Sequence, residues 1–175
     1  MLQATVPTSH LDIASELEKL KTYEELYPKR ELILDFGRIL VGIRHTMSND
    51  SKPKVLLIDD EKFLLEIYSI KFLRSGFDVY ACTSADEGTI AIQRGYKPDV
   101  ILFDITMPIK NGYQFLEDLE RLHLAKKALK IALTNENQIA EMGRTKELGA
   151  HAHLVKAKYT PAELAALVSS MLKNR

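Results

Sequence analysis

The sequence predicts an α/β fold, a doubly wound parallel sheet of five βα units preceded by an α-helical N-terminal extension. Short apolar runs rich in branched side chains alternate with amphipathic stretches from residue 54 onward, the pattern of strands and helices in α/β proteins. Glycines stand where several of these helices should end, and carboxylates follow two of the apolar runs directly. Because each strand is followed by a helix, the strands should be parallel, with helices on both faces.

Length and composition fit one domain with an appendage. The chain has 175 residues, 46% of them hydrophobic, with 24 basic and 24 acidic residues. Because the formal charge is zero, attraction to a phosphate backbone should be weak, and we expect no nucleic-acid partner. The lone Cys82 excludes an internal disulfide, and neither a signal peptide nor an apolar run of about 18 residues is present. We therefore expect a cytoplasmic protein that does not bind a membrane.

Residues 1–52 are predicted to form a helical extension that ends in a polar linker, so we place the domain boundary before Pro53. The strongest helix of this extension carries one apolar stripe, but Leu34 and Val41 lie on its opposite side. This helix either packs once on its own domain or also touches a second protomer. Because so short a helical segment cannot bury an independent core, a homodimer through residues 9–45 is one hypothesis.

Residues 53–175 should form the α/β domain. Each expected strand is a short apolar run bounded by turn residues, and each expected helix has apolar residues at three- and four-residue steps. Gly76, Gly95 and Gly149 fall at expected helix ends. The predicted order is strand 54–58, helix 61–75, strand 78–82, helix 84–95, strand 99–103, helix 111–124, strand 129–133, helix 137–148, strand 152–156 and helix 160–173.

The third predicted strand ends at a carboxylate. Val100 to Phe103 are consecutive apolar residues, typical of a strand buried on both faces, and Asp104 follows them. Open α/β sheets bind ligands at the carboxyl ends of their strands. Pro108 and Gly112 then provide turn chemistry before the next helix. Asp104 is either a ligand-binding acid or an aspartate that merely ends a strand.

The first strand also runs into carboxylates, Asp59 and Asp60. Either could simply cap the next helix. If the first and third strands are neighbours, however, these residues and Asp104 lie within a few ångströms of one another. Two like charges at 4 Å repel by about 4 kcal/mol at an effective dielectric near 20, so such a cluster must hold protons or a cation. Oxygen ligands favour Mg²⁺ (or Mn²⁺) over zinc.

The fourth and fifth strands end in Thr134 and Lys156, which should project at the same edge of the sheet. A hydroxyl and a positive charge suit the side of a phosphoryl group that faces away from a metal ion. Each residue alone could be an ordinary strand-terminal surface residue. Polar side chains at this many strand ends favour a site.

These residues resemble the receiver domains of two-component response regulators, which share a flavodoxin-like (βα)5 fold. The resemblance runs from about Lys54 to Leu172. The motifs that carry it are the acid pair Asp59-Asp60, Pro98-Asp99 before Asp104, the run Asp104-x-x-Met107-Pro108-x-x-x-Gly112, Thr134 and Lys156.

The resemblance implies that Asp104 is the phosphoacceptor, which attacks the phosphohistidine of a sensor histidine kinase or phosphotransfer protein. It also implies that Asp60 and Asp104 ligate Mg²⁺ directly, that Asp59 does so through water, and that the backbone carbonyl of Thr106 completes the protein ligands.

In the same family the residues at Lys156 and Thr134 contact and report the phosphoryl group, and an aromatic switch residue usually stands where this chain has His153. His153 either responds to pH near neutrality or is a solvated side chain at a tolerant position. Ala157 replaces the usual proline, so we expect a trans peptide bond and a shifted Lys156 loop. Asn135 replaces a usual small residue, which could crowd the phosphoryl group.

We therefore expect a phosphorylatable receiver in a phosphorelay that signals by binding a downstream protein partner. It would be no enzyme beyond catalysing its own phosphorylation and dephosphorylation. Because the last predicted helix reaches the end of the sequence, we expect no output domain. One alternative is a phosphorylation-independent interaction module. Another is a Mg²⁺-dependent hydrolase of small phosphoesters, for which the N-terminal helices would have to supply a substrate cap.

Overall fold

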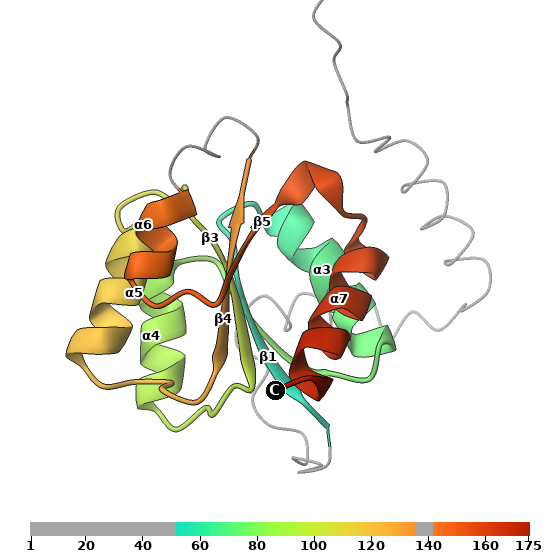
Figure 1. Cartoon of the computed structure of the whole chain (residues 1–175), viewed down its shortest axis with the longest axis horizontal. Helices are drawn as coiled ribbons and strands as arrows, with labels where there is room; N and C mark the ends of the chain where they lie inside the picture. Colours follow the sequence, from blue (N-terminus) through green and yellow to red (C-terminus); the bar gives the residue numbers. More distant parts are fainter. Residues whose placement is uncertain (1–51, 136–141) are drawn as a thin grey trace, which may run out of the picture. The chain divides into compact units, whose positions relative to one another are not determined.

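The computed structural model describes residues 52–135 and 142–175. Within these ranges, five parallel strands form one sheet in the order β2-β1-β3-β4-β5, with helices on both faces (Figure 1). The α/β prediction is confirmed, whereas the predicted helices and dimer contact within residues 1–51 lie outside the described residues. The strands are β1 (Lys54–Ile58), β2 (Asp78–Cys82), β3 (Val100–Asp104), β4 (Leu129–Thr134) and β5 (Ala152–Val155). The helices are α3 (Lys62–Arg74), α4 (Ala85–Gln93), α5 (Gly112–Arg121), α6 (Met142–Glu147), α7 (Pro161–Lys173) and the 3-10 helix η2 (Lys156–Lys158).

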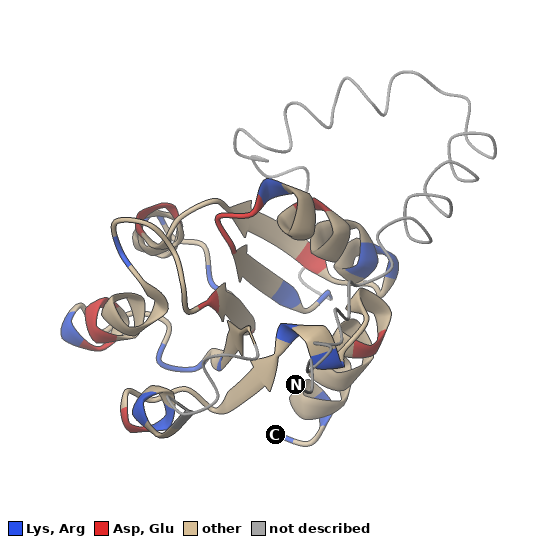
Figure 2. Cartoon of the chain, turned by 90° about the horizontal axis from the view of Figure 1, so that it is seen from above, with Lys and Arg blue, Asp and Glu red and all other residues tan. Residues whose placement is uncertain are grey.

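The sheet separates two apolar layers, and Figure 2 shows from above that helices lie on both sides of it. On one face, α4 and α5 pack over a cluster that includes Ile58 and Phe103. On the other face, α3 and α7 cover a cluster that includes Leu57 and Leu102. Because successive strand residues point to opposite faces, each central strand supplies both layers and reads as a continuous apolar run. Burial on both faces makes the central strands a rigid base for the loops at their carboxyl ends.

β1 lies between β2 and β3, and β3 lies between β1 and β4. The expectation that the first and third strands are neighbours is therefore confirmed. The register pairs Ile58 with Phe103, so the residues that follow β1 and those that end β3 reach the same edge of the sheet.

Most helices end as the glycines predicted. Gly76, Gly95 and Gly149 have φ angles of 89°, 101° and 87°, and each donates its amide to a carbonyl three residues back. This is the Schellman arrangement, in which a left-handed residue closes the last turn. α5 ends in the same way, but at His123, with φ 55°. The predicted helix 111–124 was therefore too long, because a left-handed histidine gives no sequence signal.

Several strand boundaries also differ from the prediction by one residue, including the start of β3 at Val100 and the end of β4 at Thr134. Asp104 is the last residue of β3 rather than the residue after it, and Lys156 begins η2 instead of ending β5. Of the predicted helix 137–148, the structure describes α6, and residues 136–141 lie outside the described ranges. Cys82 is buried and free. No helix within the described ranges is long and apolar enough to cross a membrane.

Candidate functional site

Three carboxylates meet at the carboxyl edge of the sheet. Asp59 follows β1, Asp60 comes next, and Asp104 ends β3, and one ligand oxygen from each lies within 4.8 Å of the others. The Asp59 and Asp104 residues are each 3% exposed, whereas Asp60 is exposed. The sequence-predicted acid cluster is therefore formed, with two buried members and one that faces solvent.

Backbone hydrogen bonds fix the two buried acids in place. The Asp59 amide donates to the Cys82 carbonyl at 3.2 Å, which extends the pairing of β1 with β2. The Ile105 amide donates to the Leu133 carbonyl at 3.0 Å, so the chain on the far side of Asp104 is tied to β4. Both carboxylates thus stand on backbone that is held beyond the strand end.

The alternative that the acid pair merely caps the next helix is not what the structure shows. Glu61 is the N-cap residue of α3, and its side chain makes no capping hydrogen bond. Asp59 does assist the helix entry, because its Oδ1 accepts a hydrogen bond from the Glu61 amide at 3.0 Å. Its other oxygen, Oδ2, faces the cluster and accepts from Lys156.

Lys156 reaches across the sheet to both buried acids. Its Nζ lies 2.7 Å from Asp59 Oδ2 and 3.0 Å from Asp104 Oδ1. Burial disfavours the charge on this ammonium, but the two carboxylates outweigh burial and raise its pKa. The expected trans peptide bond before Ala157 is confirmed, since the described residues contain no cis peptide bond. The expected shift of the Lys156 loop stays a prediction, and the Lys156 ammonium contacts both Asp59 and Asp104.

The charge on Asp104 is costly in this pocket. Burial raises its pKa from 3.8 to about 6; the Lys156 ammonium opposes that rise, and the charges of Asp59 and Asp60 add to it. Apart from the ion pair with Lys156, the buried Oδ1 of Asp104 has no hydrogen-bond partner among the described residues. Near pH 7 the carboxylate is mostly ionised and incompletely compensated.

These donors fit a hard divalent cation. One ammonium faces three carboxylates, so the cluster carries excess negative charge when all are ionised. Carboxylate oxygens with an exposed member suit Mg²⁺ or Mn²⁺, which keep some water ligands, better than zinc. Thr106 is exposed in the loop two residues after Asp104, and its carbonyl remains a predicted ligand.

Gly112 explains why the loop after Asp104 can fold back on it. A Cβ at this position would lie 2.6 Å from the Asp104 carbonyl oxygen and 2.9 Å from Ile105 Cα. The Gly112 amide also donates to the Ile105 carbonyl at 2.9 Å. Any larger residue would push the loop off the phosphoacceptor candidate.

The two predicted switch residues occupy different settings. Thr134 is fully buried at the end of β4, and its hydroxyl donates to the Asn135 carbonyl at 3.2 Å. His153, on β5, is half-buried, and its Nδ1 lies 3.0 Å from the Thr145 hydroxyl of α6. The interpretation of His153 as a solvated side chain is therefore wrong. Burial also lowers the pKa of His153. The switch roles themselves remain predictions.

Sequence reasoning missed Thr145, which is 1% exposed and links α6 to β5 through His153. Six helical residues show too little periodicity to mark one hydroxyl as inward-facing, so the sequence carries no usable signal for this pair.

Comparison with known proteins agrees with this geometry. The sequence matches the response regulator receiver domain family over residues 55–169. Among curated proteins, it is 27% identical over 125 residues to a probable transcriptional regulator, ycf27, of Porphyra purpurea, covering 71% of this chain and 49% of the relative. It is 28% identical over 121 residues to the alkaline phosphatase synthesis transcriptional regulatory protein PhoP of Bacillus subtilis, covering 69% and 49%. The chain thus spans about half the length of these relatives.

Solved structures share the fold. The chemotaxis protein CheY4 of Vibrio cholerae superposes with a TM-score of 0.63 at 25% identity, covering 69% of this chain and 98% of that one. A CheY-like receiver domain of Methanospirillum hungatei gives a TM-score of 0.63 at 24% identity, covering 71% and 96%. With the family match over most of the chain and the acid cluster in place, this chain belongs to the response regulator receiver domain family of two-component systems.

Proposed function

We propose that this chain accepts a phosphoryl group on Asp104 from the phosphohistidine of a sensor histidine kinase or phosphotransfer protein, in a Mg²⁺-dependent reaction. The observation that carries the proposal is the convergence of the Asp59 and Asp60 carboxylates on the buried Asp104, which Lys156 also contacts. Asp59, Asp60 and Asp104, with the Thr106 carbonyl, would hold the metal ion. When bound, Mg²⁺ neutralises charge on the carboxylates and on the incoming phosphoryl oxygens.

The chemistry requires an ionised nucleophile and a way to offset charge. With a pKa of about 6, Asp104 is mostly ionised near pH 7 and needs no general base. Its oxygen attacks the phosphorus atom, and the P–N bond of phosphohistidine breaks. The bonding electrons return to the imidazole nitrogen, which leaves as a neutral ring because the other ring nitrogen carries a proton. Lys156, already 3.0 Å from Asp104 Oδ1, would turn to the transferred phosphoryl oxygens.

The phosphoryl group would then change a partner-binding surface. Its oxygens would offer the Thr134 hydroxyl a new acceptor, while His153 on the neighbouring β5 is tied to α6. The readout would then be at the face built from α6, β5 and α7, to which a downstream protein would bind. The protein would work in the cytoplasm as a signalling domain and would catalyse only its own phosphorylation and dephosphorylation.

The relatives' names as transcriptional regulators describe proteins about twice as long as the matched segment. The function proposed for this chain is that of the receiver domain alone. We do not favour the phosphorylation-independent interaction module, because that role would not require a buried carboxylate with an unfavourable charge. The phosphoester hydrolase would need a substrate cap, for which the described residues offer no candidate.

The test uses the full chain, Mg²⁺ and acetyl phosphate, with intact mass as the measurement. We expect a gain of one phosphoryl group in wild type, no gain with EDTA, and no gain in Asp104→Asn. Glu117→Gln, which removes an exposed carboxylate on α5, serves as the matched control and should still be phosphorylated. Equal labelling of wild type and Asp104→Asn would refute the assignment of the phosphoacceptor.

A further inference from the structure

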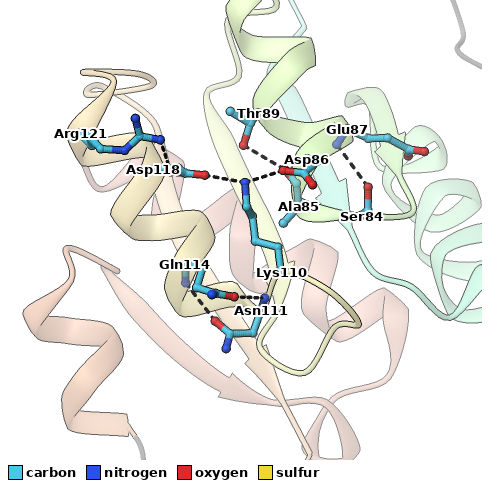
Figure 3. A network of polar contacts seen from close by, with 10 residues as sticks. All are labelled: Ser84, Ala85, Asp86, Glu87, Thr89, Lys110, Asn111, Gln114, Asp118 and Arg121. Carbon is cyan, nitrogen blue, oxygen red and sulfur yellow. Dashed lines mark hydrogen bonds and ion pairs between the residues drawn. The ribbon is translucent and has the colours of Figure 1, made fainter.

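Lys110 lies in the loop between β3 and α5, with its side chain between two helices (Figure 3). Its Nζ contacts Asp86 Oδ1, in the first turn of α4, and lies 2.6 Å from Asp118 Oδ2 of α5. Arg121 also contacts Asp118, at 2.5 Å, from the same helix. The Lys110 side chain is 26% exposed and that of Asp118 is 16% exposed, so water screens their contact less than a surface ion pair.

The loop that carries Lys110 has an unfavourable backbone conformation. Ile109 has φ 68°, a left-handed value that a β-branched residue rarely adopts. The Lys110 amide donates to the Pro108 carbonyl at 2.7 Å, which closes a tight γ-type turn around Ile109. The Ile109 side chain is 99% exposed, so its own packing does not hold this turn. Such a conformation persists only when neighbouring contacts hold it.

The same loop is joined closely to the acid cluster. Gly112, two residues after Lys110, lies so near the Asp104 carbonyl oxygen that a Cβ would not fit, and its amide donates to the Ile105 carbonyl. Asn111 between them forms the capping box of α5 with Gln114 (Figure 3). Lys110 therefore stands between the strained turn and the residue that touches the Asp104 backbone. Thr106 belongs to the same loop.

We propose that Lys110 is a positioning residue, whose ion pairs to Asp86 and Asp118 hold loop 105–111 in the conformation that a divalent cation requires. The inference rests on the proposed function, since it assigns Lys110 a role in the predicted metal site. The ammonium acts from outside the site, by fixing the backbone that carries Thr106 and abuts Asp104. Metal affinity depends on such supporting residues as well as on the ligands.

The alternative is that Lys110 has only a structural role, which would differ from a positioning role in its effect on the loop near Asp104. If Lys110 only joined α4 to α5, its loss would loosen both helices and leave the loop near Asp104 unchanged. Arg121→Met is the matched control, because it removes the other cation bonded to Asp118 without touching the loop. Asp86→Asn is the second variant, because it removes the Lys110 contact to α4 and leaves the lysine in place.

The experiment measures amide hydrogen exchange by NMR in the metal-free full chain, and Mg²⁺ affinity by calorimetry, for wild type, Lys110→Met, Asp86→Asn and Arg121→Met. For Lys110→Met we expect the Gly112 amide to exchange about tenfold faster than in wild type. We also expect Mg²⁺ to bind about three- to tenfold more weakly, which is at or just below the lower end of the effect usual for residues that support metal ligands. Asp86→Asn should move both readouts in the same direction, and Arg121→Met should move neither.

Equal effects of Lys110→Met and Arg121→Met, or no effect of either, would overturn the proposal. Should Lys110→Met fail to fold, Asp86→Asn decides by the same comparison. If wild type binds no Mg²⁺ at all, the proposed function fails. If wild type binds no Mg²⁺ and the Gly112 amide of Lys110→Met exchanges at the wild-type rate, the positioning role is overturned as well. If that amide exchanges faster, Lys110 holds the loop, but its role in metal binding is overturned.

Discussion

Replacing Asp104 by asparagine should stabilise the metal-free protein while abolishing its proposed activity. The reason is the unfavourable charge on this residue, because burial, Asp59 and Asp60 disfavour its ionised form more than Lys156 favours it. Asparagine has nearly the shape of the carboxyl group but stays neutral at every pH. The substitution therefore mimics the protonated form that the fold prefers.

The magnitude follows from the pKa. Raising the pKa of Asp104 from 3.8 to about 6 corresponds to about 3 kcal/mol of unfolding free energy, at 1.36 kcal/mol for each pH unit. Because the folded-state pKa lies above the unfolded one, the stability contributed by this group is present below about pH 4 and lost as pH rises through 6. The Asp104→Asn variant would retain this stability at every pH. Its unfolding free energy should therefore exceed that of wild type by almost nothing at pH 4 and by the largest amount above pH 7.

The assay is urea unfolding of both proteins in EDTA, followed by circular dichroism at pH values from 4 to 8. Saturating Mg²⁺ should shrink or reverse the difference at pH 8, because the ion binds wild type better. Asp118→Asn is the control of opposite sign: Lys110 and then Arg121 lower the pKa of Asp118, so losing its charge should destabilise at neutral pH. The reasoning would be refuted if Asp104→Asn were no more stable to unfolding than wild type at pH 8, or if its extra stability were the same at every pH.

Three further predictions concern the loop, the metal site and the β5 contact. Gly112→Ala should destabilise by about 2 kcal/mol or more in urea unfolding, because its Cβ would lie 2.6 Å from the Asp104 oxygen. Gly143→Ala, in α6 with nothing within 4 Å of its Cβ, should instead stabilise by roughly 0.4–1 kcal/mol. Mg²⁺ affinity measured by calorimetry should fall about tenfold for each pH unit below 6, because the protonated Asp104 must ionise first; a flat profile from pH 7 to 5 contradicts this. Thr145→Val should cost about 1–2 kcal/mol in thermal unfolding, because the buried hydroxyl bonded to His153 is lost; an unchanged melting temperature would show that this contact contributes nothing.

Much of the fold could be predicted because its signals are local. The buried strands appear as apolar runs, and left-handed glycines mark the ends of α3, α4 and α6. The end of α5 could not be predicted, because His123 adopts the left-handed conformation without a glycine. Nothing in the local pattern indicated that Lys156 would leave β5 for a 3-10 turn.

The carboxylate cluster could be predicted because parallel strands bring their carboxyl ends to one edge, so Asp59 and Asp104 follow from topology. The Lys110 contacts could not, because they depend on how α4 packs beside α5 and on the turn at Ile109. The pairing of His153 with Thr145 depends in the same way on tertiary packing, which a helix of six residues does not reveal.

The central claim is that Asp104 itself becomes the acyl phosphate. The most direct test is to treat the protein with acetyl phosphate and Mg²⁺, reduce it with borohydride, and map the product by peptide mass spectrometry. Borohydride converts an aspartyl phosphate to homoserine, so we predict homoserine in place of Asp104 alone, dependent on Mg²⁺. Homoserine in place of Asp59 or Asp60 instead, or at no position while Mg²⁺ binds, would contradict the claim.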